Sequence, residues 1–351
     1  MKNKKEIIKS YLINFIAIAL MFVILMIATD AGLINRYVRG ILMTIFINII
    51  LAISLNLTTG FLGQIALGHA GFMSIGAYSA ALFVKYAQDT MGITLLQENG
   101  LTSAGLGFFL LSLLIGGGIA AVFGLIVGIP ALRLKGDYLA IITLGFGEII
   151  RSLIEYFPFT GGAQGLKKIP KLASSLNVVY IIMIVCVVIM FAFVRSRHGR
   201  AITAIREDDI ASEASGIPNT HYKVMAFTIA AFFAGVAGGI YAQYLGVLGA
   251  SSFGFMKSID ILVMVVLGGM GSLTGSILSA VGLTALPEML RSFSDYRMLI
   301  YSVVLIIVMI FKPSGLLGTY EFSLTRLIDR IVHPGKHKKA STMKKEGAEI
   351  E

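Results

Sequence analysis

The run Leu101–Ile129, LTSAGLGFFLLSLLIGGGIAAVFGLIVGI, contains no charged residue over its whole length. An α-helix rises about 1.5 Å per residue, so roughly 20 apolar residues are enough to cross the hydrocarbon of a bilayer. Small residues recur in this run at every fourth position, a spacing that lets membrane helices approach closely. They are Gly116, Ala120, Gly124 and Gly128. The run therefore predicts a membrane-spanning helix that packs against neighbouring helices.

The chain as a whole is also apolar, with few charged residues. Of its 351 residues, 56% are hydrophobic and 14% are charged, and the mean hydropathy is +0.85. A soluble domain has about 25% charged residues, so this chain lacks the polar surface that water requires. We predict an all-α fold, a polytopic membrane helix bundle of about 8–10 transmembrane helices with broken or re-entrant segments. The other candidate spans are Tyr11–Ala28, Val38–Leu57, Phe61–Val84, Tyr138–Phe157, Val178–Val194, Val224–Leu248, Ile261–Leu286 and Tyr296–Phe311.

Basic residues orient these spans, because lysine and arginine collect in cytoplasmic loops. This rule predicts a cytoplasmic tail at 1–10, a transmembrane domain at 11–311 with a cytoplasmic loop at 195–223, and a basic cytoplasmic tail at 312–351. It explains the net charge of +10 through membrane topology. No aromatic residues interleave with the basic ones, so no nucleic-acid partner is expected. Five basic residues do not follow this rule, because the predicted crossings place them on the external side of the membrane: Arg36, Arg39, Lys167, Lys168 and Lys171.

Two glycine-rich segments predict breaks inside the membrane. Nine simple crossings would leave the basic tail 312–351 outside the cell. If the segment breaks at Gly268–Gly275, GGMGSLTG, it can re-enter without crossing or make two short passes, and the tail is then cytoplasmic. Gly60–Tyr78, GFLGQIALGHAGFMSIGAY, combines glycines with polar side chains. Irregular backbone at this depth is tolerated only where protein or a water-filled cavity covers it. Both lining of a translocation pathway and plain helix packing fit these patterns. The candidate pathway residues are Gln64, Gly68, His69, Gly71, Ser74, Gly268, Gly269 and Gly271.

Glu148 is a further candidate pathway residue, because a carboxylate within the apolar run Tyr138–Phe157 is costly to place in hydrocarbon. Arg151 and Glu155 lie on the same helix face, three and seven residues further along. Glu148 therefore either acts in gating or transport, or belongs to a structural ion pair near the external end of the span.

The loop at 195–223 predicts a short helix that docks on another surface. Asp209 is placed to cap this helix, and Gly216 suits its end. Ile210, Ala214 and Ile217 fall on one face and form an apolar stripe on an otherwise charged helix. The stripe is expected to rest either on lipid or on a cytoplasmic partner.

Several stretches, in this order along the chain, closely resemble the LivM-type permeases of branched-chain amino acid ABC importers. The resemblance covers about residues 40–320. The stretches are Gly63–Tyr78 (GQIALGHAGFMSIGAY), Leu132–Arg151 (LRLKGDYLAIITLGFGEIIR), Thr160–Gly165 (TGGAQG), Gly199–Gly216 (GRAITAIREDDIASEASG) and Val265–Gly275 (VVLGGMGSLTG).

The resemblance implies that Arg206–Gly216 is the coupling helix, which rests in a groove of an ATPase subunit. Ser215 departs from the family's second alanine, and the spacing to the glycine is shorter than in the general importer consensus. The implied coupling residues are Gly199, Arg200, Arg206, Glu207, Asp208, Glu213, Ala214 and Gly216. The implied partners are a second homologous permease, two ATP-binding subunits and an extracytoplasmic substrate-binding protein, in a multi-pass assembly of the bacterial inner membrane.

The sequence contains no Gly-x-x-x-x-Gly-Lys-Ser/Thr loop, so ATP and magnesium are expected only in partner subunits. No catalytic constellation and no metal-ligand spacing is evident, so we expect neither an enzyme nor a metal site. Two other functions fit the residues. One is a secondary transporter with Glu148 as its coupling group, and the other is a membrane scaffold that only recruits a cytoplasmic partner.

Overall fold

The computed structural model describes residues 20–27, 29, 31–32, 35–91, 96–97, 100–134, 136–293, 296–312, 314–318 and 321. Residues 35–320 form one compact unit, and residues 1–34 with 321–351 form another. In the second unit, residues 20–27 are helical. The predicted tail at 1–10, most of the predicted first span and residues 322–351 lie outside the described residues.

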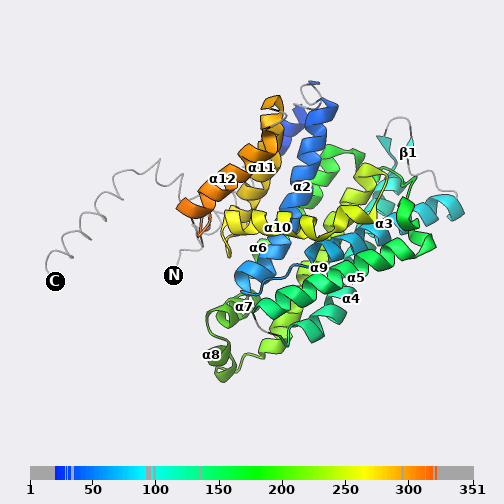
Figure 1. The fold of residues 1–351 in the computed structure, drawn as a ribbon. Coiled ribbons are helices and arrows are strands. Elements are labelled where there is room, and N and C mark those ends of the chain that lie inside the picture. The colour runs from blue at the N-terminus through cyan, green and yellow to red at the C-terminus, as the bar shows by residue number, and fades with distance from the viewer. Residues whose placement is uncertain are drawn as a thin grey trace, which may run out of the picture. The chain divides into compact units, whose positions relative to one another are not determined.

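The unit 35–320 is built from helices, with one short β-hairpin (Figure 1). Its longer helices are α2 (Arg36–Asn56), α3 (His69–Met91), α4 (Ser103–Ala131), α5 (Asp137–Tyr156), α6 (Leu176–Arg195), α7 (Arg197–Glu207), α9 (Asn219–Leu245), α10 (Phe255–Gly268), α11 (Leu273–Met289) and α12 (Arg297–Phe311). A six-residue helix, α8 (Asp209–Ala214), follows α7.

Short elements join these helices. A π-helical turn, η1 (Leu57–Phe61), extends α2. The 3₁₀ turns are η2 (Pro158–Thr160), η3 (Gly162–Gln164), η4 (Leu172–Ser174), η5 (Ala250–Phe253) and η6 (Leu290–Phe293). Strands β1 (Leu96–Gln97) and β2 (Gly100–Leu101) pair antiparallel, with Leu96 opposite Leu101.

The composition of these helices confirms the predicted polytopic bundle. Five stretches of the described residues are long and apolar enough to cross a membrane. They are Arg36–Phe61, Ala104–Ala131, Leu176–Arg195, Asn219–Leu245 and Ala250–Gly268. Shorter apolar helices occupy Leu273–Met289 and Leu299–Phe311. Helices α3 and α5, which were also predicted to span, are not among the five.

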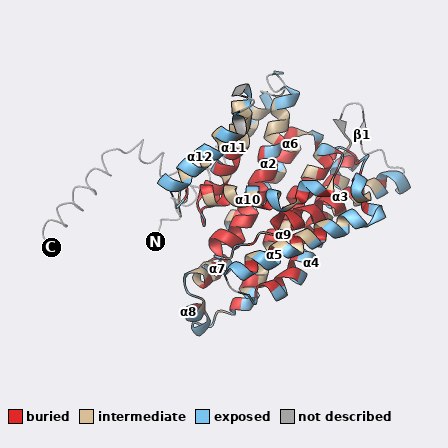
Figure 2. Ribbon diagram, viewed as in Figure 1, coloured by how far each residue is buried: buried red, intermediate tan, exposed pale blue. Residues whose placement is uncertain are grey.

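The core lies where α9 packs against α3, α4 and α2. Figure 2 shows the buried residues gathered along α2, α3 and α9, with exposed residues on the outer sides of α4 and α5. The exposed residues of α4 include Leu114, Val122 and Ile126, apolar side chains that suit contact with lipid tails. Glycines allow the close approach, since a Cβ at Gly76 would lie 2.2 Å from the Gly235 Cα.

Both predicted breaks are present. Helix α10 ends at Gly268 and α11 begins at Leu273, so the predicted span Ile261–Leu286 is two helices. The predicted span Phe61–Val84 was wrong at its start, because residues 62–68 are not helical and α3 begins only at His69. Residues 314–318 pack against the end of α10, where Leu316 N–H donates to the Leu267 carbonyl at 2.7 Å.

We expect Gly76→Ala to destabilise the bundle by about 3 kcal/mol, because the new methyl group overlaps backbone of α9 and the helices must separate. The matched control is Gly118→Ala in α4, where a Cβ meets no atom within 4 Å. This control should be neutral or about 1 kcal/mol more stable, because alanine favours helix over glycine. Thermal unfolding of the two variants in the same detergent tests this, and equal melting temperatures would contradict the packing role of Gly76.

Candidate functional site

The first break, residues 62–68, is bonded to the preceding turn at its start and to a neighbouring helix near its end. The π-turn continues into it, since Leu62 N–H donates to the Leu57 carbonyl at 3.1 Å. At the start of α3, Leu67 N–H donates to Thr143 Oγ1 of α5 at 3.0 Å, and Ala70 N–H donates to Ser258 Oγ of α10 at 3.1 Å. An interrupted helix inside a membrane needs such partners, because lipid offers none.

The predicted pathway residues of this segment separate into two groups. Two of the polar ones are satisfied within the protein, which supports a packing role. The buried His69 Nε2 lies 2.8 Å from Ser54 Oγ, and Ser74 Oγ donates to the Gly71 carbonyl at 2.7 Å. Gln64 differs, since its buried Oε1 has no hydrogen-bond partner among the described residues. Packing alone therefore does not account for Gln64, and its role in a pathway stays a prediction.

Gly68 and Gly71 are contact points between α3 and α5. A Cβ at Gly68 would lie 2.1 Å from the Thr143 carbonyl oxygen, and one at Gly71 would lie 2.9 Å from the Gly147 Cα. Helix packing is thus sufficient to explain both glycines. The prediction that they line a pathway gains no support from this geometry.

The second break, residues 269–272, also rests on close backbone contacts. Gly269 and Gly271 have φ angles of 111° and 90°, which favour glycine. A Cβ at Gly268 would lie 2.5 Å from the Gly275 carbonyl carbon. The last carbonyls of α10 accept from the segment 314–318, including Leu317 N–H on Gly268 at 3.3 Å. The three predicted glycines therefore shape the break.

Asn56, the fully buried last residue of α2, joins the two breaks. Its Oδ1 accepts from Gly271 N–H at 2.9 Å, and its Nδ2 donates to the Ser272 carbonyl and to Ser276 Oγ at 2.9 and 2.8 Å. Since η1 follows Asn56 directly, the start of the first break is hydrogen-bonded to the second.

Arg206, near the end of α7, reaches the same junction. Its Nη1 donates to the Gly60 carbonyl in η1 at 2.8 Å. A Cβ at Gly63 would lie 2.6 Å from Arg206 Cγ, and one at Gly271 would lie 2.8 Å from Nη1. The absence of side chains at these two glycines therefore makes room for the arginine. Arg206 contacts both breaks from a helix that follows the span α6.

Helices α7 and α8 lie at one end of the unit, beside the start of α9 (Figure 1). The prediction of a single helix over Arg206–Gly216 was wrong, because the chain turns at Asp208. This residue has φ −157° and caps α8 by accepting from Ile210 and Ala211 N–H, both at 2.9 Å. Gly216 ends the helix as predicted, with φ 84°, and Ile217 N–H donates back to the Ser212 carbonyl at 3.1 Å.

Asp209 was predicted to be the cap, but it fastens α8 to α9 instead. Its carboxylate pairs with Lys223 at 2.9 Å and accepts from Asn219 Nδ2 at 2.8 Å. Ser212 Oγ also contacts Asn219 Oδ1 at 3.1 Å. These bonds hold α8 rigidly on the first turn of α9. These contacts connect α8 to the central helix of the bundle.

The predicted apolar stripe of α8 is largely exposed. Ile210 is 81% exposed and Ala214 is also exposed, while Ile217 is partly covered. The remaining predicted coupling residues surround this stripe or lie on α7. Glu207 and Glu213 are exposed, Arg200 contacts the Arg195 carbonyl, and Gly199 packs on the Val194 backbone. Among the residues that the structure describes, none covers the Ile210 side chain, so the stripe is available to a partner.

Glu148 forms the ion pair that was one of its two predicted roles. Its Oε2 lies 2.7 Å from Arg151 Nε, and its Oε1 accepts from Phe255 N–H at the start of α10 at 3.1 Å. Arg151 also pairs with Glu155 at 3.3 Å. The carboxylate lines a surface pocket of about 500 Å³ together with Ser251, Ser252, Lys257 and Asp260. It connects α5 to α10 within a polar surrounding.

We expect Glu148→Gln to change stability by less than about 1 kcal/mol, because the pair is partly exposed and the amide oxygen can still accept from Phe255 N–H. Substrate flux should stay within roughly twofold of wild type, a change of about 0.4 kcal/mol. Flux assays on the two proteins at equal expression test this. Abolition of flux would instead favour the secondary-transporter alternative, with Glu148 as its coupling group.

Asn56, Asn219 and Lys223 were not singled out from the sequence, and no contact with Arg206 was predicted for Gly60 and Gly63, although both lie in the predicted break. A signal existed for Asn56, since an amide inside the apolar run Val38–Leu57 is expensive unless it is bonded. The partners of Asn219 and Lys223 are ten and fourteen residues away, and nothing in the local pattern pairs them. Among the described residues, no group of three or more His, Cys, Asp or Glu side chains is placed to hold a metal ion.

Residues 37–311 match a family model described as branched-chain amino acid transport system / permease component. The chain is 37% identical to the high-affinity branched-chain amino acid transport system permease protein LivM of Salmonella typhimurium, over 77% of this chain and 68% of that protein. The same identity and coverage hold for LivM of Escherichia coli. LivH of Salmonella typhimurium is 30% identical over 41% of this chain and 47% of its own. No solved structure matches.

Proposed function

This chain belongs to the family of branched-chain amino acid transport permeases, and we propose that it is the membrane permease subunit of an ATP-binding-cassette importer. In this proposal it forms part of the translocation pathway for branched-chain or related hydrophobic amino acids. An extracytoplasmic binding protein delivers them, and two ATP-binding subunits drive the cycle. The assembly lies in the bacterial cytoplasmic membrane, and the chain itself carries out no catalysis.

A second, related permease completes the proposed pathway. Relatives named LivM and LivH both match this chain, although LivH matches a shorter part of it. Two related permeases in one transport system would form the pathway between them. The free Oε1 of Gln64 marks the residue of this chain that we expect to face that pathway.

The observation that carries the proposal is the exposed apolar stripe of α8, a helix that Asp209 bonds to α9. A six-residue helix is too short to be stable alone, yet α8 is capped at both ends and bonded to α9. Leaving Ile210 in water costs free energy that a soluble partner can recover by covering it. A groove in an ATP-binding subunit fits this need.

The coupling mechanism follows from two connections. When the ATP-binding subunits close, they displace α7 and α8 as a rigid body. The bonds of Asp209 transmit the displacement to α9, and Arg206 transmits it to both breaks. Breaks with positive-φ glycines are the parts of the membrane domain that can change direction while the long helices stay intact. The pathway would thereby open alternately to the two sides.

Affinity purification of the tagged chain from its native membranes in mild detergent tests this function. We expect stoichiometric recovery of a second permease and two nucleotide-binding subunits. Recovery of the chain alone, still able to move solute, would instead support a secondary transporter. Partner recovery in an assembly that moves no solute under any condition would favour a scaffold.

A further inference from the structure

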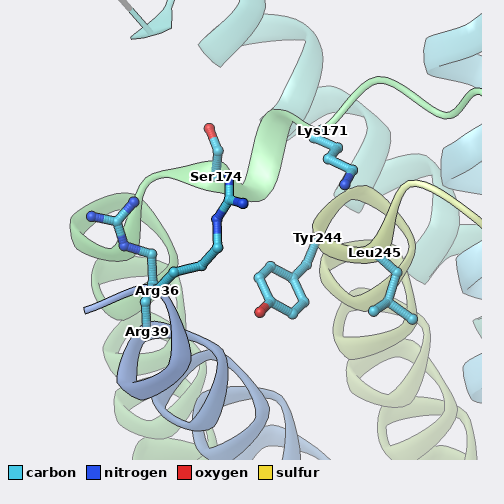
Figure 3. A pocket seen from close by; sticks show the side chains of 6 residues that line it. All are labelled: Arg36, Arg39, Lys171, Ser174, Tyr244 and Leu245. Carbon is cyan, nitrogen blue, oxygen red and sulfur yellow. The ribbon is translucent and has the colours of Figure 1, made fainter. Parts of the chain in front are cut away.

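A basic pocket lies at the end of the unit opposite α7 and α8. It has a volume of about 590 Å³ and is lined by Arg36, Arg39, Lys171, Ser174, Tyr244 and Leu245. Figure 3 shows the three cationic side chains and the Tyr244 ring around one hollow. They come from the start of α2, the segment before η4 and the end of α9.

The three cations have no anionic partner in the described part of the chain. No carboxylate lines the pocket, and no ion pair joins Arg36, Arg39 or Lys171 to another described residue. Arg39 is half-buried, and its Nε lacks a hydrogen-bond partner. Like charges gathered in one pocket repel one another, and a buried donor without an acceptor is costly. A bound anion would reduce the repulsion among the cations and accept a hydrogen bond from Arg39 Nε.

These cations also contradict the positive-inside pattern. With α7 and α8 in the cytoplasm, the far end of α9 faces outside, since its 27 residues extend about 40 Å. Topology therefore gives no reason for basic residues here. A bound ligand does give one.

The position of the pocket at the ends of two long helices suits a lipid ligand. A helix of about 40 Å exceeds the roughly 30 Å of hydrocarbon, so the last turn of α9, with Tyr244 and Leu245, would reach the headgroup level of a bilayer that α9 crosses. Arg39 lies about one turn into α2 and lines the same pocket. The exposed side chains of Leu245 and Val247 add an apolar surface next to the cations.

We propose that this pocket binds the phosphate of an anionic phospholipid. Arginine guanidinium groups match phosphate oxygens in paired hydrogen bonds, and Lys171 adds a third charge. Ser174 supplies a hydroxyl donor at the rim, and Leu245 packs against the glycerol and upper acyl chain. The inference depends on the membrane setting of the chain and is independent of which solute it carries.

The test is native mass spectrometry of the tagged protein, with any co-purifying subunits, after exchange into detergent with equal amounts of phosphatidylglycerol and phosphatidylcholine. Wild type should retain phosphatidylglycerol in at least about tenfold excess, because the three cations attract an anionic headgroup and a zwitterionic one carries no net charge. Arg39→Gln with Lys171→Gln should lose that excess. The matched control, Lys167→Gln with Lys168→Gln, removes two exposed charges from the same segment outside the pocket and should keep it.

Three results would overturn the proposal. The first is the absence of any preference for phosphatidylglycerol in wild type, which does not depend on how the variants fold. The second is displacement of the lipid by an equal amount of inorganic phosphate, which would identify a free anion as the ligand. The third is loss of a soluble acidic protein from the purified assembly in the pocket variant with lipid retention unchanged, which would identify a protein-docking surface.

Discussion

Ala214→Glu is expected to remove the ATP-binding subunits from the purified assembly while the permease stays folded in the membrane. Ala214 is exposed on α8 beside Ile210, so glutamate is tolerated in the free chain. In the complex its carboxylate would be covered by an apolar groove without a partner. That burial costs at least about 2 kcal/mol, or a factor of about 30 in Kd. Co-purification with quantification of each subunit measures the effect.

Thr220→Glu is the matched control for Ala214→Glu. Thr220 is exposed at the same end of the unit, in the first turn of α9 and outside the apolar stripe. A carboxylate there also suits the positive end of the helix. The control should retain its partners. Undiminished recovery of the ATP-binding subunits with Ala214→Glu would show that α8 is not the docking helix.

Arg206→Ala is expected to separate ATP hydrolysis from transport. The substitution leaves the α8 surface intact, so the ATP-binding subunits should remain bound. It removes a charged donor from the Gly60 carbonyl, a hydrogen bond worth about 1.5–3 kcal/mol. It also leaves a void between Gly63 and Gly271. The displacement of α7 would then no longer reach the breaks, and solute moved per ATP should fall at least about tenfold, equivalent to 1.4 kcal/mol.

Arg200→Ala provides the comparison within the same helix. Arg200 is exposed on α7, and its Nη1 donates to the Arg195 carbonyl at 3.2 Å, five residues back along the chain. Its loss should therefore leave the ratio of transport to hydrolysis unchanged. Arg206→Lys keeps the positive charge but lacks the planar guanidinium group with its several donors. An intermediate ratio of solute transport to ATP hydrolysis is expected for this variant. If Arg206→Ala transports solute with a normal ratio, the coupling route runs elsewhere, and the bonds between Asp209 and α9 become the next candidates.

Much of the fold could be predicted from the sequence, because membrane helices are long apolar runs and glycine clusters mark their interruptions. The break at 269–272 was located by combining glycine content with the charge of the tail. The end of α8 at Gly216 was also predicted, since few other residues accept φ 84°. These features depend on local backbone preferences, which a single sequence shows directly.

The predictions that failed depend on distant partners. Asp208 and Asp209 are equally suitable residue types for a helix N-cap. The Asp209 carboxylate bonds to Lys223 and Asn219 of α9, and Asp208 caps α8 instead. The contacts of Gly68 and Gly71 with the backbone of α5 could not be predicted either, because α5 lies far along the chain from them. That these glycines line a pathway stays a prediction. Arg206 was predicted as part of a docking loop, yet its side chain turns toward Gly60 in the membrane domain.

We propose that this chain moves amino acids in a cycle that ATP hydrolysis drives through α7 and α8. The most direct measurement is uptake of a radiolabelled branched-chain amino acid by proteoliposomes. They contain the chain with its co-purified subunits, the binding protein on one side and ATP on the other. We predict uptake that requires both ATP and the binding protein and that Ala214→Glu abolishes. Equal uptake without ATP, driven by an ion gradient, would show that this chain is not part of an ATP-driven importer.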